Sequence, residues 1–130
     1  LLVGNGRAGA GGNEPQMMAF SPPKVGNGQF RVAVSEALGG APAILALRNQ
    51  PPGAGGGGSI GGILSRSPSR VAFRTQLSGV GAGQGFGTWN SEIPNDPALV
   101  GTQFWMQWLV RDQAAAGGVA RSKWAEVTVY

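Results

Sequence analysis

The sequence predicts an all-β protein, an antiparallel β-sandwich of seven or eight strands, jelly-roll-like or immunoglobulin-like, with an extended N-terminal arm. Three observations predict this class. Glycine supplies 24 of 130 residues and charged residues only 12%, against about 7% and about 25% in average soluble domains. Short apolar runs rich in aromatic and β-branched residues alternate with Gly and Pro turns. No segment keeps the period of an amphipathic helix. The expected strands cover residues 16–21, 29–36, 43–48, 63–65, 71–77, 86–93, 101–112 and 119–130.

The chain divides into an arm and one domain. Residues 1–13, "LLVGNGRAGAGGN", combine an apolar tip with a flexible glycine-rich run. Residues 14–130 are long enough to form a single sandwich domain. The arm frays as an ordinary terminus, lies on its own domain, or adds its apolar tip as a strand to the open sheet edge of a neighbouring copy.

The strand at residues 29–36, "QFRVAVSE", has the clearest alternation of apolar and polar positions. Successive strand side chains point to opposite faces, so Phe30, Val32 and Val34 are predicted to face the core. Further on, residues 50–62 form a glycine-rich centre that we expect to be a long surface loop. A phosphate-binding loop would need Gly-Lys-Ser/Thr before a helix, and neither follows this run.

Residues 101–112, "GTQFWMQWLVRD", are predicted to be the central strand. This segment is a continuous apolar run without internal Gly or Pro, which indicates burial on both faces. The inward face is expected to hold Phe104, Met106, Trp108 and Val110. The outward face is expected to hold Trp105, Gln107, Leu109 and Arg111. Just before this strand, Asp96 and Pro97 predict a single helical turn over residues 97–100.

The last expected strand, residues 119–130, repeats the alternation. Its inward face is predicted to hold Ala125, Val127 and Val129. Its outward face is predicted to hold Trp124, Glu126, Thr128 and Tyr130. Two neighbouring strands therefore send Trp105, Trp124 and Tyr130 to the same outer side.

The segment "IPNDPALVG" followed by "QFWMQWLVRD" and a final strand resembles a C-terminal β-sandwich module of large secreted and surface proteins of environmental bacteria. That module carries an "IP.DPAL.G...Y.QW.V.D" segment before a final "S......TI"-type strand. The resemblance covers residues 93–130 and implies a β-sandwich and export, with no catalytic roles. The glycine-rich centre departs from the module and indicates use as a building block. The matching positions are Ile93, Pro94, Asp96, Pro97, Ala98, Leu99, Gly101, Gln107, Trp108, Val110, Asp112, Ser122, Val127 and Thr128.

The residue inventory argues against catalysis. The chain has no Cys and no His, which removes thiol chemistry, disulfides and the commonest metal ligand and general base. A glycosidase would need two facing carboxylates, for example Glu92 with Asp112 or Glu126. Capping and solvation account for these acids more simply, so we predict no enzyme, no metal and no cofactor.

Charge and hydropathy restrict the partners. The net charge of +4 comes from eight Arg and two Lys that are scattered along the chain, without the clustering of a nucleic-acid-binding surface. No apolar run approaches the ~20 residues of a membrane span. We expect neither a nucleic-acid partner nor a membrane span. The first residue is Leu and not Met, which leads us to expect a processed, extracellular or cell-surface chain.

The outward aromatics and the apolar arm lead to two functional hypotheses. The first is a structural, non-enzymatic subunit that self-assembles into a filament or surface layer. Its interface would use Leu1, Leu2 and Val3 of the arm. The outward Trp105, Trp124 and Tyr130 would complete the contact. The alternative is a carbohydrate-binding module that uses the same exposed aromatics to bind polysaccharide. In a third interpretation, the arm or the glycine-rich centre of the same chain covers the aromatics.

Overall fold

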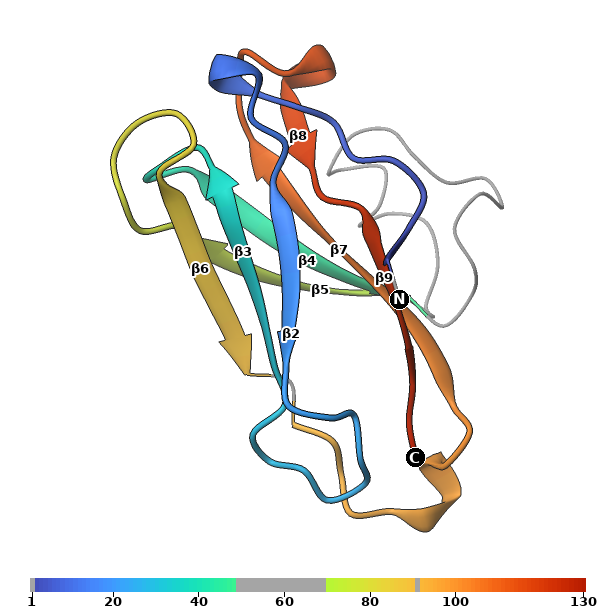
Figure 1. Cartoon of the computed structure of the whole chain (residues 1–130). Coiled ribbons are helices and arrows are strands. Elements are labelled where there is room, and N and C mark those ends of the chain that lie inside the picture. Colours follow the sequence, from blue (N-terminus) through green and yellow to red (C-terminus); the bar gives the residue numbers. More distant parts are fainter. Residues whose placement is uncertain (1, 49–69, 91) are drawn as a thin grey trace.

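The structure, a computed structural model, describes residues 2–48, 70–90 and 92–130. They form two antiparallel sheets with almost no helix (Figure 1). The six strands of the larger sheet are β1 (Leu2–Val3), β4 (Pro42–Arg48), β5 (Arg70–Gln76), β7 (Gln103–Arg111), β8 (Val119–Arg121) and β9 (Trp124–Thr128). The three strands of the smaller sheet are β2 (Gln16–Phe20), β3 (Arg31–Ala37) and β6 (Gly85–Asn90). Helical structure in these ranges is limited to the 3₁₀ turns η1 (Ala10–Gly12), η2 (Pro97–Leu99) and η3 (Ala116–Gly118).

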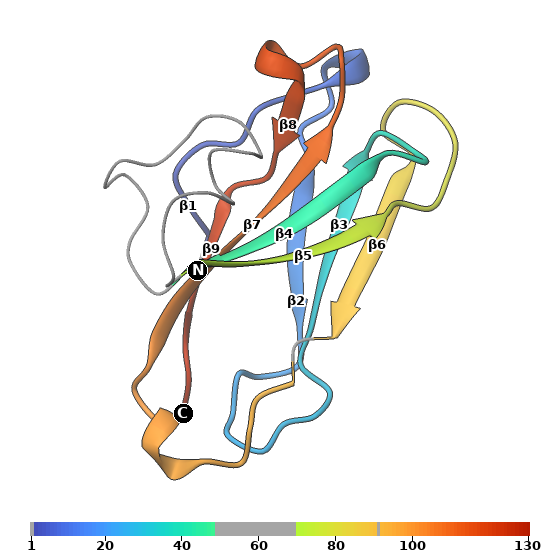
Figure 2. The same cartoon turned by 180° about the vertical axis from the view of Figure 1, so that it is seen from behind.

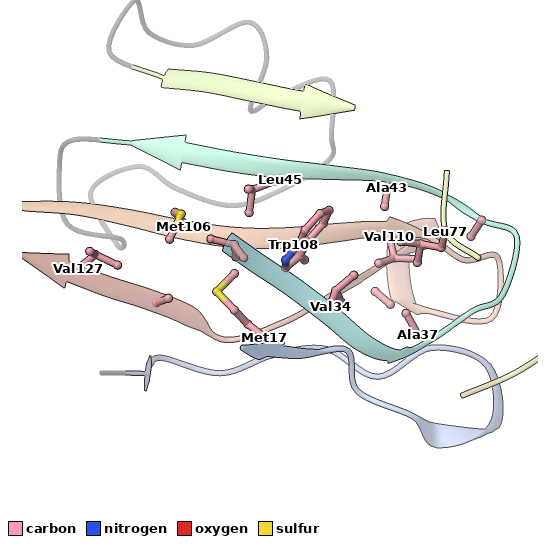
Figure 3. Close-up of a cluster of buried hydrophobic side chains, with 14 of the residues drawn as sticks. Met17, Val34, Ala37, Ala43, Leu45, Leu77, Met106, Trp108, Val110 and Val127 are labelled. Atoms are coloured by element: carbon pink, nitrogen blue, oxygen red, sulfur yellow. The ribbon is translucent and has the colours of Figure 1, made fainter. Parts of the chain in front are cut away.

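One hydrophobic core joins the two sheets, which pack against each other in a sandwich-like arrangement (Figure 3). Val32 and Val34 of β3 and Met17 of β2 contribute from the smaller sheet. Trp108 and Met106 of β7 contribute from the larger sheet and are fully buried. The inward faces predicted for the strands at residues 29–36 and 101–112 are therefore confirmed, because the two-residue period of a strand fixes which side chains share a face.

Strand β7 is central to the larger sheet, as the sequence predicts. The order is β1-β9-β7-β4-β5, and β8 also pairs with β7. On one side, β4 runs antiparallel to β7 with Leu45 opposite Trp108. On the other side, β8 and β9 follow one another along the same edge of β7. The strand is thus buried between neighbours, in agreement with its continuous apolar sequence.

The expected single strand over residues 119–130 is wrong, because the chain forms two strands, β8 and β9, with a break between them. Leu109 pairs with Arg121 and Met106 with Ala125. The two intervening residues of β7 therefore face three residues of the partner, which is a β-bulge. The fully buried Ser122 lies in the bulge. Its Oγ accepts the Trp108 N–H at 3.0 Å, and its own N–H donates to the Trp108 carbonyl at 3.0 Å.

The helical turn expected after Asp96 is confirmed as η2. The Asp96 side chain accepts a hydrogen bond from the Ala98 N–H at 3.0 Å, and Pro97 occupies the first helical position. Both features match the preferences of helix N-termini. The strand predicted at residues 63–65 and the glycine-rich centre at residues 50–62 lie outside the described residues.

Candidate interaction surfaces

The predicted aromatic patch does not form an exposed surface. Trp105 lies on the outward face of β7, as expected, but is only 7% exposed. Its outward neighbours Gln107 and Leu109 are also buried. Leu109 belongs to a second buried cluster on this face, together with residues of β4 and β8. The expectation that Trp105 contacts solvent or a partner is thus corrected. Alternation predicts which face of the strand a side chain is on, but it does not predict what packs over that face.

The other two aromatics are separated along the chain and differ in exposure. Trp124 opens β9 and is half-buried, with the Arg48 guanidinium 5.6 Å from its ring centroid. That distance is within the range of a cation–π contact. Tyr130 follows the end of β9 and is 55% exposed. Its backbone N–H donates to the Pro23 carbonyl, and its carbonyl accepts from the Val25 N–H. The two rings therefore do not form one binding platform.

The arm extends the edge of its own sheet (Figure 2). Leu2 pairs with Ala125 and Val3 with Trp124 in antiparallel register. Farther along, the backbones of Arg7 and Arg121 exchange two hydrogen bonds of 2.8 and 3.0 Å. Leu2 is 48% exposed and Val3 is half-buried, whereas Leu1 lies outside the described residues. The described part of the tip thus contacts the parent domain, an arrangement that the sequence left open beside the neighbouring copy of our leading hypothesis.

Asp112 holds the middle of the arm. This buried carboxylate accepts the Ala10 N–H through Oδ2 at 2.7 Å and the Ala114 N–H through Oδ1 at 3.0 Å. Gly9 lies against the same carboxylate, in a space that a side chain could not share. Such hydrogen bonds to an ionised acceptor are stronger than neutral ones. We conclude that Asp112 has a structural role, fixing the arm against the turn after β7.

Two like charges face each other where the arm meets β8. Arg7 and Arg121 are directly opposite residues of an antiparallel bridge. Burial lowers the pKa of Arg121, and the nearby Arg7 charge lowers it further. Arg7 donates through Nη1 to the Ala116 carbonyl at 2.9 Å. Directly opposed like charges destabilise a strand pair, so this contact is the electrostatically weakest point that we find in the described arm.

An apolar surface that the sequence interpretation missed covers the outer face of the smaller sheet. Met18, Phe20 and Phe86 expose 56%, 45% and 56% of their surface. Their inward neighbours, such as Met17, belong to the core, so alternation turns these three side chains outward. The signal was present in the sequence, because residues 17–20 are apolar at both inward and outward positions.

A shallow hollow of about 360 Å³ lies on this same face. Phe20 of β2, Arg31 of β3, Thr88 of β6 and the preceding Gln29 line it. Phe20 and Arg31 are directly opposite one another in the register of β2 and β3. The Arg31 guanidinium donates through Nη2 to the Gln29 Oε1 at 3.1 Å. The lining thus combines an aromatic ring, a cation, an amide and a hydroxyl.

Neither metal nor membrane features stand out in the described ranges. No three His, Cys, Asp or Glu side chains of residues 2–48, 70–90 and 92–130 gather closely enough to bind a metal ion. No helix in these ranges has the length and apolar character to cross a membrane.

Comparison of the chain with protein-family models, with curated proteins and with solved structures found no match. The resemblance of residues 93–130 to an exported module stays a prediction.

Proposed function

We propose that the chain is a non-enzymatic structural subunit that self-assembles outside the cell or at the cell surface. The observation that carries the proposal is the pairing of β1 with the edge strand β9. This pairing involves only two residue pairs, and Leu2 remains half exposed within it. The same backbone hydrogen bonds can form with the β9 edge of a second copy, because strand addition does not depend on which chain supplies the strand.

If the arm tip of one copy pairs with the β9 edge of another (arm exchange), the geometry of this joint favours filaments over closed rings. The donor is the arm tip and the acceptor is the β9 edge, so the two surfaces of the joint differ. Joints of this heterologous type build filaments unless the rotation between copies closes a ring. The opposed Arg7 and Arg121 charges weaken the arm's attachment to its own domain, which makes release of the arm less costly. Trp105 has no role in this joint because it is buried.

We further infer that the sandwich is immunoglobulin-like and not a jelly roll. In an immunoglobulin-like domain, strands A, B and E share one sheet, and strands G, F, C and C′ share the other. The orders β2-β3-β6 and β9-β7-β4-β5 correspond to these two sets in sequence order. Extracellular location rests on the resemblance of residues 93–130.

The absence of cysteine from the sequence provides a direct test of arm exchange. Two single variants, Leu2→Cys and Ala125→Cys, introduce thiols at paired positions. Directly opposite strand residues lie close enough for a disulfide. When the two variants are mixed and oxidised, exchange predicts a disulfide-linked heterodimer on a non-reducing gel. Its yield should rise with protein concentration.

The matched control pairs Leu2→Cys with Ser35→Cys, an exposed position on the other sheet. This mixture should give much less heterodimer at the same concentration. The double variant Leu2→Cys/Ala125→Cys, oxidised when dilute, should form an internal disulfide and lose self-association in light scattering. Equal heterodimer from both mixtures, or an unchanged mass at all concentrations for the natural chain, would rule out the arm as the joint.

Carbohydrate binding is the second candidate function. The observation that favours it is the hollow beside exposed Phe20, where an aromatic ring lies among hydrogen-bonding side chains. On this proposal the ligand surface is on the smaller sheet, whereas the sequence suggested Trp105, Trp124 and Tyr130.

A further inference from the structure

We infer that the hollow lined by Phe20, Gln29, Arg31 and Thr88 binds the carboxylate-bearing sugars of an acidic polysaccharide. The inference deepens the second candidate function and does not require arm exchange. It follows from the side chains of the hollow, from the charge of the surrounding face and from the shape of the surface.

The side chains of the hollow match the chemical groups of a uronic acid. The Phe20 ring is 45% exposed and offers an apolar surface to the C–H face of a sugar ring. Thr88 and Gln29 offer a hydroxyl and an amide to sugar hydroxyls. The Arg31 guanidinium has five N–H donors, of which the described contact to Gln29 uses one. The remaining donors can bind a carboxylate in the bidentate manner that arginine favours.

The charge beside the hollow favours an anionic ligand. Arg31 is the only charged residue in the lining of the hollow. The other charged residue of β3 that is exposed on this sheet is Glu36, in the bulge between Val34 and Ala37 at the far end of the strand. An acidic polymer supplies the negative charge that the lining lacks. A second copy stacked through the same face could bring its Glu36 to Arg31, and light scattering distinguishes that contact from polysaccharide binding.

The shape of the site favours a polymer over a small free molecule. The hollow is shallow and lies on an open sheet face that continues to the exposed Met18 and Phe86. Small ligands are usually held in concave sites that cover most of their surface. A polysaccharide chain that lies across the three strands can contact the hollow with one sugar and the apolar surface with its neighbours.

The test measures binding of the full chain to polygalacturonate and to the same polymer with methyl-esterified carboxyl groups. Affinity gel electrophoresis reports retardation by each polymer. We expect retardation by polygalacturonate and at least roughly tenfold weaker retardation by the esterified form, because charge-assisted hydrogen bonds are the strong ones. Equal retardation by both polymers would overturn the carboxylate assignment.

Variants locate the site. Arg31→Ala should weaken binding roughly tenfold, and Phe20→Ala several-fold. Arg111→Ala is the matched control, since it removes the same charge from an exposed position on the larger sheet. It should change binding by less than about twofold. Equal loss in Arg31→Ala and Arg111→Ala would show that the polymer follows net charge and not the hollow.

A concentration series of light scattering on Phe20→Ala separates this inference from self-assembly. Weaker polysaccharide binding with unchanged mass supports the glycan site. Reduced self-association with unchanged polysaccharide binding would overturn it and assign the face to a contact between copies. The cysteine experiment on the arm is independent of both outcomes, because Leu2 and Ala125 belong to the other sheet.

Discussion

Gly9 shows how one absent side chain seats the arm on the domain. A methyl group at this position would overlap the Asp112 carboxylate and crowd Ala120. That carboxylate cannot move freely, because it accepts the Ala10 and Ala114 N–H groups. The glycine therefore allows the backbone of the arm to approach the turn closely enough for hydrogen bonding.

We predict that Gly9→Ala lowers the free energy of unfolding by about 1–3 kcal/mol, the usual cost of overpacking. Urea denaturation followed by tryptophan fluorescence measures the change. Gly28→Ala is the control, because an added methyl group there meets open space. It should change stability by about 0.5 kcal/mol or less. Similar losses in the two variants would contradict close packing at Gly9.

Ser122 is a second single residue that fixes the local backbone, here in the bulge of the larger sheet. Its Oγ accepts the buried N–H of Trp108 and donates to the Lys123 carbonyl at 2.8 Å. The Ser122 hydroxyl thus accepts the Trp108 N–H in place of a backbone carbonyl, which the bulge moves out of register.

Replacing this serine by alanine leaves the Trp108 N–H without an acceptor. We expect Ser122→Ala to cost about 1–3 kcal/mol of stability, the penalty for a buried unpaired donor. Chemical denaturation gives the value, and Ser35→Ala, at an exposed position of β3, should cost about 0.5 kcal/mol or less. If both alanines have equally small effects, Ser122 does not hold the bulge.

At the scale of elements, the described arm is attached at three places of different strength. The tip pairs through Leu2 and Val3, Arg7 bonds to Arg121 and to the Ala116 carbonyl, and Ala10 bonds to Asp112. The contact to the buried carboxylate should be the strongest of the three. The opposed arginines should be the weakest, because burial and mutual repulsion oppose the Arg121 charge.

Loss of the Asp112 carboxylate should therefore release the arm before it unfolds the domain. We predict that Asp112→Ala accelerates trypsin cleavage after Arg7 by roughly tenfold, because cleavage follows local opening. Mass spectrometry of a time course identifies the cut. Asp96→Ala removes a comparable side-chain cap from η2 and should leave this rate unchanged. Equal acceleration in both variants would mean that the arm responds to global destabilisation.

At the scale of the whole molecule, the core is complete without the arm. The main cluster of buried residues begins at Met17, and no described residue before it belongs to the cluster. The two sheets share this cluster. The arm covers an edge of the larger sheet and does not fill its interior.

Deleting residues 1–13 should consequently leave a folded domain of lower stability. We expect a cooperative urea transition and retained near-ultraviolet circular dichroism. Deleting residues 1–3 removes only the β1 pairs and should cost about 1–2 kcal/mol, less than the longer deletion, which also takes the Asp112 contact. Loss of the cooperative transition in the longer deletion would show that the arm belongs to the core.

The sequence by itself determined the class of structure and the face of most strand residues. Phe30, Val32 and Val34 lie in the core as their alternation predicts, and so does Trp108. The turn at Asp96 follows equally from neighbouring residues. These features are local, because the pleat of a strand and the cap of a helical turn depend on adjacent positions in the chain.

Only the tertiary structure decided what covers each face and edge. The outward side of β7 is buried at Trp105, while the outward side of β2 is open at Met18 and Phe20. Both strands have apolar outward residues, so their own sequences could not distinguish them. The arm pairs with β9 of its own domain, and Ser122 interrupts the last strand by its hydrogen bond with Trp108. Both contacts join residues that are distant in sequence. Burial depends on which segments meet in space, and alternation along one strand carries no information about them.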